Sequence, residues 1–194
     1  MIGHARQFIA YAKNQHNALI GTWGFDGGTE FLNDTFKNML RYNGILSETS
    51  VPDMHQQNGR AEHLNCTIMD KVQSMHFHAC LTDTIWEFSW DHVIHVYNRT
   101  LISHLKWRTP FEALRNKKPD VSHLCIFSCC AYVFLPEDVR ANKLSPKSET
   151  MIYLGQPAGY KGCCFYRITN GQIFIDATAV FDETYFPHCS DGKQ

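Results

Sequence analysis

Two carboxylates in the first third of the sequence have a spacing that suits metal-dependent phosphoryl transfer. Asp26 follows an apolar segment in a glycine-rich run, and thirty-five residues separate it from Glu62, at the start of an amphipathic segment. Divalent cations held by such acids can activate an attacking oxygen and stabilise the leaving oxygen of a phosphodiester. A site of this kind needs several acids from different elements, usually three, and two are visible here.

Each acid also has an ordinary structural explanation. Asp26 suits a turn beside glycines, and Glu62 suits the first turn of a helix, where the helix dipole favours a negative charge. The joint occurrence of Asp26, Glu62 and the preceding loop Gln56-Gln57-Asn58-Gly59 argues against chance as the explanation for the two acids.

The residues around the two acids resemble the second half of a copia-type retrotransposon integrase core. Members of that family are D,D-35-E polynucleotidyl transferases with a ribonuclease H-like fold. The resemblance covers about residues 8 to 187. It continues downstream in four segments: Thr109-Pro110-Phe111-Glu112-Ala113-Leu114, Lys117-Lys118-Pro119-Asp120-Val121-Ser122-His123-Leu124, Ala131-Tyr132-Val133 and Val180-Phe181-Asp182-Glu183.

This resemblance implies a set of site residues and ligands. Asp26 and Glu62 would be the catalytic residues and the ligands of Mg²⁺ or Mn²⁺, and DNA would be the substrate. The residues that the resemblance places against nucleic acid are Gln56, Gln57, Asn58, Gly59 and Asn65.

A counterpart of the family's first aspartate is missing from the sequence. In the family that residue lies on the first strand of the sheet, whereas the sequence resembles the family from near the helix after the third strand. Asp34, Asp53 and Asp70 are nearby acids, but each is expected on a solvent-facing helix or loop. Without a third acid the metal pair would be weakly held, so we expect this chain to be inactive as an enzyme.

Further departures from the family weaken the expected DNA contact. Gly27 stands where the family usually has asparagine, and the stretch 62–66 replaces one that is rich in arginine and lysine. Cys66 therefore stands where a cation would contact a phosphate. Asp53 and His55 replace an aromatic residue and a proline. We expect DNA binding to be weak or lost.

Composition indicates a globular protein of one ordinary domain or two small ones. The chain has 194 residues, of which 44% are hydrophobic and 13% aromatic. No apolar run approaches the length of a membrane span, and the first residues lack the pattern of a secretion signal. We expect an intracellular protein, with the nucleus as one option. A formal net charge of −1 counts against tight DNA binding.

The eight cysteines and eleven histidines predict no metal site of their own. Reduced thiols are the expectation for a chain without a secretion signal. The adjacent pairs Cys129-Cys130 and Cys163-Cys164 would point to opposite faces of a strand rather than to one ion. The histidines are scattered and are expected to be solvated or half-buried.

Apolar periodicity predicts alternating helices and short strands up to about residue 116. The predicted elements are a helix over 6–13, a buried strand over 18–23, a helix over 31–40 that stops at Asn43-Gly44, and a strand over 45–51. From Gly59 one buried helical stripe is formed by Leu64, Ile68, Val72, Met75 and Ala79. A helix from Asp83 is expected to bury Trp86, Trp90, Val93 and Tyr97, and a capping box begins the next at Thr109.

After the break at residues 117–119 the pattern becomes rich in short strands. They are expected at 125–127, 131–135, 151–154, 163–168, 172–175 and 178–181, with a hairpin turn at Asn170-Gly171. The predicted fold class is α/β, a truncated ribonuclease H-like core that lacks its first strands, followed by a small all-β SH3-like barrel. The predicted domains are 1–116 and 117–187, with a tail over 188–194.

Three functional hypotheses are compatible with these patterns. The chain is an integrase fragment that acts as an enzyme once missing strands are supplied, a non-catalytic module that binds nucleic acid or protein, or a transposon remnant without a cellular role. The apolar strand predicted over 18–23 would present an exposed sheet edge, which favours a homo-oligomer.

Overall fold

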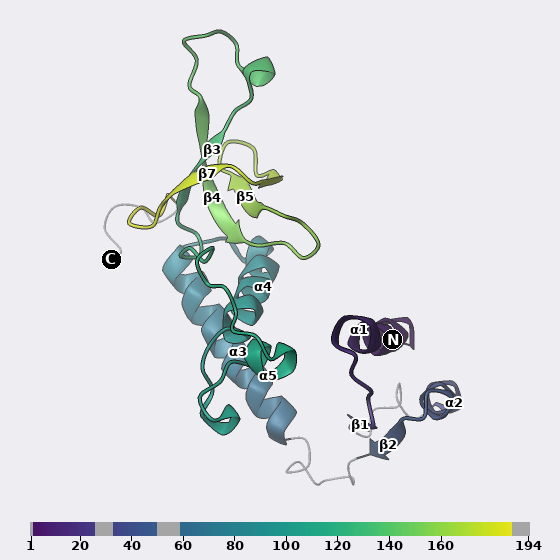
Figure 1. Ribbon diagram of the computed structural model, residues 1–194. Coiled ribbons are helices and arrows are strands. Elements are labelled where there is room, and N and C mark those ends of the chain that lie inside the picture. The colour runs from purple at the N-terminus through teal and green to yellow at the C-terminus, as the bar shows by residue number, and fades with distance from the viewer. Residues whose placement is uncertain (1, 26–32, 50–58, 188–194) are drawn as a thin grey trace. The chain divides into compact units, whose positions relative to one another are not determined.

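A computed structural model of the chain describes residues 2–25, 33–49 and 59–187 (Figure 1). The chain divides into two compact units, 1–66 and 67–194. The boundary between the units falls within helix α3 (Gly59–Ala79). It is not the predicted domain boundary at residues 116–117, and the domains 1–116 and 117–187 stay a prediction.

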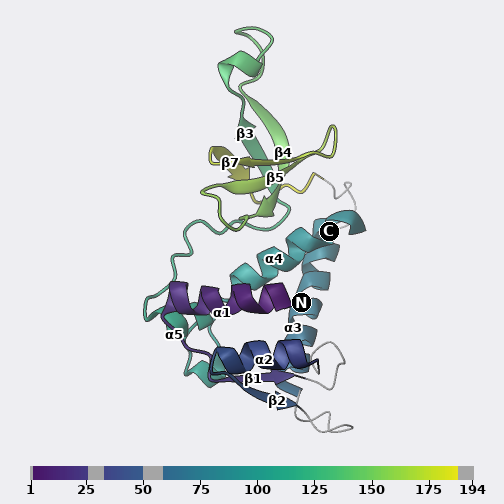
Figure 2. The same cartoon turned by 90° about the vertical axis from the view of Figure 1, so that its right-hand side faces the viewer.

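In the first unit two helices cover one face of a two-stranded parallel sheet (Figure 2). The elements are α1 (Ile2–His16), β1 (Thr22–Phe25), α2 (Asp34–Tyr42) and β2 (Leu46–Thr49). Ala5 from α1, Phe25 from β1 and Phe36 from α2 meet in their shared core. All four residues of β2 are exposed, so the buried side chain that this small sheet contributes, Phe25, comes from β1.

The end of α1 shifts the first strand from its predicted place. Asn17 adopts a left-handed conformation with φ of 49°, and the N–H of Ala18 donates to the carbonyl of Ala12 at 3.1 Å. A left-handed residue directly after the last helical residue is a common helix end. Residues 18–21 therefore connect helix to strand, and Leu19 is 87% exposed. The strand predicted over 18–23 was wrong in its start, because the helix runs three residues longer than the predicted one.

The second unit combines helices with a five-stranded antiparallel sheet. The helical elements are α3, η2 (Asp83–Ile85), α4 (Trp86–Tyr97), η3 (Ser103–Leu105), α5 (Pro110–Arg115) and η4 (Glu137–Val139). The strands are β3 (Cys130–Phe134), β4 (Ser148–Gly155), β5 (Cys163–Arg167), β6 (Ile173–Asp176) and β7 (Ala179–Asp182). They lie in the order β6-β5-β4-β3-β7. The predicted strand over 125–127 is absent, because these residues lie in an irregular segment and a turn before β3.

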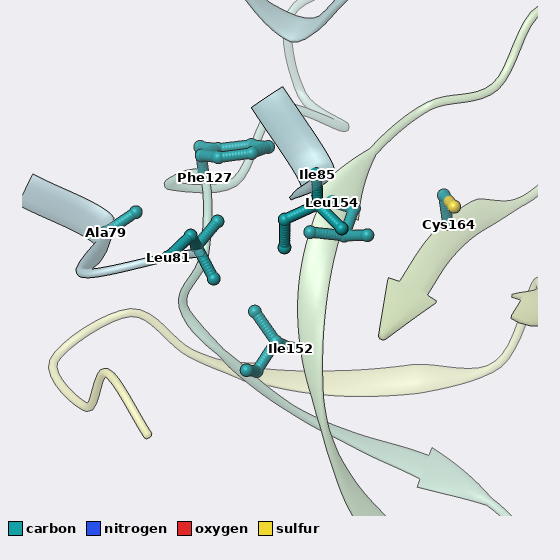
Figure 3. Packing of buried hydrophobic residues seen from close by; sticks show 7 residues of the cluster. All are labelled: Ala79, Leu81, Ile85, Phe127, Ile152, Leu154 and Cys164. Atoms are coloured by element: carbon teal, nitrogen blue, oxygen red, sulfur yellow. The ribbon is translucent and has the colours of Figure 1, made fainter. Parts of the chain in front are cut away.

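Strand β4 lies at the centre of this sheet and is buried on both faces. On one face Ile152 and Leu154 pack against Leu81, Ile85 and other residues of the helical segment (Figure 3). On the other face alternate residues of β4 pack in a second cluster; its fully buried members are Cys129, Ala131, Val133, Met151, Tyr153 and Phe165. Because successive side chains of a strand point to opposite faces, one strand supplies both clusters.

The buried faces of α3 and α4 differ in part from those predicted. On α3, Ile68, Val72 and Ala79 are buried as expected, but Leu64 is exposed. On α4, Trp86 is 52% exposed, so the prediction that it is buried was wrong. The 3-10 turn η2 precedes the helix, and the buried face consists of Ser89, His92 and Val93.

Three local predictions are confirmed. The Thr109 hydroxyl accepts a hydrogen bond from the N–H of Glu112 at 3.0 Å and caps α5. Gly44 ends the α2 segment with φ of 69°, and Gly171 makes the turn between β5 and β6 with φ of 70°. No described helix is both long enough and apolar enough to cross a membrane.

The two-sided burial of β4 predicts a large stability loss from Ile152→Ala. Ile152 has no exposed surface, so its truncation leaves a cavity between the helices and the sheet. We expect the free energy of unfolding, measured by urea denaturation, to fall by about 2–5 kcal/mol. The control is Ile173→Ala on edge strand β6, where the side chain is 41% exposed and the loss should be clearly smaller. Equal losses in the two variants would contradict the packing.

Candidate functional site

The structure places three of the predicted site residues at the start of α3. Gly59 is its first residue, Glu62 lies on its first turn, and Asn65 follows one turn later; Glu62 and Asn65 are exposed. The other predicted site residues lie outside the described part of the chain: Asp26, Gln56, Gln57 and Asn58. The convergence of Asp26 on Glu62 therefore stays a prediction.

The described residues by themselves do not form the expected Mg²⁺ or Mn²⁺ site, and Asp26, the other expected ligand, lies outside them. Within the described ranges, no three or more histidine, cysteine, aspartate or glutamate side chains are grouped so as to hold a metal ion. Magnesium binding requires near-octahedral oxygen coordination, which the exposed carboxylate of Glu62 does not supply by itself. The acids Asp34 and Asp70 are exposed, as the sequence predicts. We therefore assign no chemical step to a metal.

The paired cysteines lie in or beside the packed interior of the sheet. Cys163 contributes to the cluster around Tyr153, whereas Cys164 contributes to the opposite cluster around Ile152, so their predicted divergence is confirmed. Burial raises the pKa of the Cys129 thiol to about 12 and that of Cys164 to about 11. Both thiols are therefore mostly protonated near pH 7, which disfavours nucleophilic attack by either sulfur.

His92 lies where α4 packs against β4. Its ring is 4% exposed and lies 5.2 Å from the ring of Phe127 and 5.9 Å from that of Tyr153. A Cβ atom added to Gly155 would lie 2.9 Å from His92 Nδ1, and Gly155 has φ of 105°. The glycine thus provides the space that the imidazole occupies. Burial lowers the pKa of His92 to about 4, so this imidazole is neutral near pH 7.

His95 and His123 form a second histidine contact. Their Nε2 atoms lie 3.1 Å apart, so one imidazole donates its proton to the other. Burial, followed by the charge of Arg99 and by His123, lowers the pKa of His95 to about 4. Two imidazoles without further ligands do not make a metal centre. The pair joins α4 to the segment before the sheet.

Each unit has a hollow in its described surface. A hollow of about 560 Å³ between α3 and α4 is largely apolar, and Met75, Val93, Tyr97 and Phe127 are among the residues that line it. A hollow of about 690 Å³ between α1 and α2 is more polar, and Arg6 and Lys13 are among its lining residues. Glu62 lines neither of them.

A basic segment over residues 99–118 is the feature that sequence reasoning missed. It contains six lysine and arginine residues and one acid, Glu112. The near-neutral charge of the whole chain concealed it, because acids elsewhere balance the total. A local charge count over twenty residues would have found it.

Comparison with known proteins relates nearly the whole chain to retrotransposon polyproteins. Residues 129–194 match the family described as "Retroviral polymerase SH3-like domain". The chain is 34% identical over 189 residues to the Retrovirus-related Pol polyprotein from transposon TNT 1-94 of Nicotiana tabacum, which covers 97% of this chain and 14% of that protein. It is 26% identical over 180 residues to the Pol polyprotein from transposon RE2 of Arabidopsis thaliana, covering 93% of this chain and 12% of that protein.

The chain thus spans 12–14% of the length of these polyproteins. Among solved structures, it is similar to a chain in the cryo-electron microscopy structure of the simian T-cell lymphotropic virus intasome in complex with PP2A regulatory subunit B56 gamma. The two are 12% identical with a TM-score of 0.47, and the match covers 96% of this chain and 66% of that one.

Burial of His92 predicts a loss of stability in mild acid. Its folded pKa, about 4, lies below the ordinary value of 6.5, so the unfolded chain binds the proton first as pH falls. The contribution of neutral His92 to the free energy of unfolding is complete above pH 6.5 and is lost as pH falls from 6.5 to 4. At pH 4.5 the loss is on the order of 2 kcal/mol. Urea denaturation at pH 7 and pH 4.5 should show this loss, and His92→Gln should reduce it.

The matched control for this pH effect is His104→Gln, which replaces an exposed imidazole. It should leave the difference between pH 7 and pH 4.5 as in the unaltered chain, because the ring is solvated in both the folded and the unfolded states. A His92→Gln variant with an unchanged pH difference would contradict the assignment of His92 as a buried neutral group.

Proposed function

Because this chain is integrase-derived and is related over nearly its whole length to the Pol polyproteins of copia-type retrotransposons, we propose that its ancestral role is metal-dependent DNA integration. In such a reaction element DNA is joined to a target by transesterification of a phosphodiester. The observation that carries the proposal is similarity over 97% of the chain to the TNT 1-94 polyprotein.

The topology of the first unit supports a ribonuclease H-like origin for the residues before the sheet. β1 and β2 are parallel and joined across α2, and α3 follows them, so the order is strand, helix, strand, helix. Parallel strands need such a crossover connection. In this proposal Glu62, exposed on the first turn of α3, is the ancestral metal ligand on a helix, and Asp26 follows β1 directly.

We further propose that the 194-residue chain by itself does not catalyse strand transfer. Of the two family acids, Glu62 lies within the described residues, and these contain no group of three or more potential metal ligands. A pair of divalent ions needs several carboxylates for tight and accurate placement.

A non-catalytic nucleic-acid-binding module is the alternative. The basic segment over 99–118 favours it, because phosphate contacts from lysine and arginine give affinity without chemistry. Glu62 distinguishes the two hypotheses, because an enzyme needs its carboxylate for activity and a binding module does not.

The inactivity proposal predicts no strand transfer or nicking by the purified chain in Mg²⁺ or Mn²⁺. The assay follows the joining and cleavage of a labelled DNA end on a denaturing gel, with and without the metal. Glu62→Gln should behave like the unaltered chain, since there is no activity to lose. Metal-dependent product that disappears in Glu62→Gln would refute inactivity and establish Glu62 as catalytic.

The ancestral role is tested by a graft of α3. Residues 59–79 replace the corresponding helix of an active copia-type integrase, and strand transfer by the hybrid is measured. The proposal expects the hybrid to retain reduced activity, because residues 62–66 lack the family's cations, and to lose the remaining activity on Glu62→Gln. Asp70→Asn, an exposed acid on the same helix, is the matched control and should leave activity unchanged. A soluble, folded hybrid in which the two substitutions have equal effects would contradict the role of Glu62.

A further inference from the structure

The segment that joins α4 to the sheet concentrates positive charge. Over residues 99–118 there are six cations and one acid, although the whole chain carries eighteen lysine and arginine residues against nineteen acids. The six cations are Arg99, Lys106, Arg108, Arg115, Lys117 and Lys118. All except Arg99 are exposed. A local excess of this kind on a near-neutral protein creates a positive surface.

None of these cations is neutralised by an ion pair within the described residues. The ion pairs there join His76 to Asp83, Arg140 to Glu137, and Arg167 to Glu149, all outside the segment. Cations that form no ion pair leave their positive potential available to an external anion.

Arg99 and Arg115 lie on the ring of the same residue, Phe111. Their guanidinium carbons lie 5.4 and 5.0 Å from the ring centroid. Arg99 Nη1 donates to the carbonyl of His95 at 2.9 Å, whereas its buried Nε has no hydrogen-bond partner among the described residues. Burial, followed by the charge of Arg115, lowers the pKa of Arg99. A bound anion would offset this repulsion, and guanidinium groups suit phosphate because their N–H groups match its oxygens.

Trp107 is held outward by a closed loop in the same segment. Its backbone N–H donates to the carbonyl of Ile102 at 3.1 Å, and the N–H of Ile102 donates to the carbonyl of Arg108 at 3.2 Å. Lys106 and Trp107 both adopt left-handed backbone conformations, with φ of 56° and 60°. Such conformations are costly for residues other than glycine and gather at functional sites. The side chain of Trp107 is nonetheless 70% exposed.

A backbone contact holds the start of α5 against the end of α4. The N–H of Phe111 donates to the carbonyl of Asn98 at 3.0 Å, which joins the start of α5 to the end of α4. The loop that carries Trp107 lies between these two residues. The indole is flanked in sequence by Lys106 and Arg108, so an exposed aromatic plane and unpaired cations share one short closed segment.

We propose that residues 99–118 form a binding surface for single-stranded nucleic acid, in which Arg99 and Arg115 contact a backbone phosphate and Trp107 stacks on an unpaired base. Basic side chains for the backbone and an exposed aromatic residue for the bases are what proteins commonly use to bind such ligands. Duplex DNA offers phosphates but keeps its base faces stacked, so it cannot use Trp107. The assignment rests on the alternative function proposed above, the nucleic-acid-binding module, and specifies its surface and its class of ligand; it uses neither Asp26, nor Glu62, nor a metal.

The first test measures the stacking contact by fluorescence anisotropy. A labelled thymidine oligonucleotide of twenty nucleotides is titrated with the full chain and with two variants, each of which replaces one exposed tryptophan by alanine. Trp107→Ala should weaken binding about 5- to 100-fold. Trp86→Ala removes a tryptophan that is 52% exposed on α4 and should leave the affinity unchanged. Equal affinities in the two variants would overturn the stacking role, provided thermal unfolding shows both to be folded.

The second test measures the phosphate contact by its salt dependence. Arg115→Gln should reduce the slope of log affinity against log salt by about 0.7, the value for one phosphate contact to a single strand. Lys161→Gln removes an exposed cation outside the segment and should leave the slope unchanged. Unchanged slopes in both variants would overturn the assignment of Arg115.

Two further ligands decide the class of partner. A duplex of the same length should bind more weakly than the single strand, and Trp107→Ala should not alter its affinity. Inorganic phosphate should displace the oligonucleotide only at far higher concentration. Tighter binding of the duplex, or equal affinity for free phosphate, would overturn the proposal for a single strand. These outcomes are independent of the α3 graft, because none of them depends on Glu62.

Discussion

The burial of β4 on both faces is the constraint on which the larger unit depends. The strand pairs with β3 and β5 and places Ile152 against the helical segment, while Tyr153 enters the opposite cluster. Backbone hydrogen bonds extend the pairing beyond β3: the N–H of Ser128 donates to the carbonyl of Tyr153 at 2.8 Å. The SH3-like match begins at residue 129, yet Phe127 lies in the cluster with Ile152. The boundary of the sequence family therefore does not coincide with a boundary of packing.

The same packing supports the proposed nucleic-acid surface. Residues 99–118 begin just after α4, which His92 holds against Gly155, and they are followed by Phe127 in the helical cluster. The His95–His123 contact joins the two sides of the segment. A loop fixed at both ends loses little conformational freedom on binding, which lowers the entropic cost of placing a tryptophan and two arginines on a ligand.

Sequence patterns predicted the features that depend on neighbouring residues. The Thr109 cap and the turns at Gly44 and Gly171 follow from local backbone and side-chain chemistry, and the structure confirms them. The exposure of Trp86 depends on how α4 packs against the sheet, where His92 fits opposite Gly155. The spacing of apolar residues along a helix does not predict such a contact. At the candidate site, Glu62 lies on the first helical turn as predicted, whereas its partner Asp26 lies outside the described residues. The basic segment escaped notice because a whole-chain charge averages over it.

Native-state hydrogen exchange tests most directly the claim that α4 and the sheet form one cooperative unit through β4. Exchange rates are measured at increasing sub-denaturing urea for amides of α4, such as Val93, and of β4, such as Tyr153. The two-sided packing predicts that both groups merge into the same opening reaction, with one free energy and one urea dependence. If the α4 amides exchange through an opening of much lower free energy while the β3–β4 amides stay protected, the sheet folds without the helices and the account is contradicted.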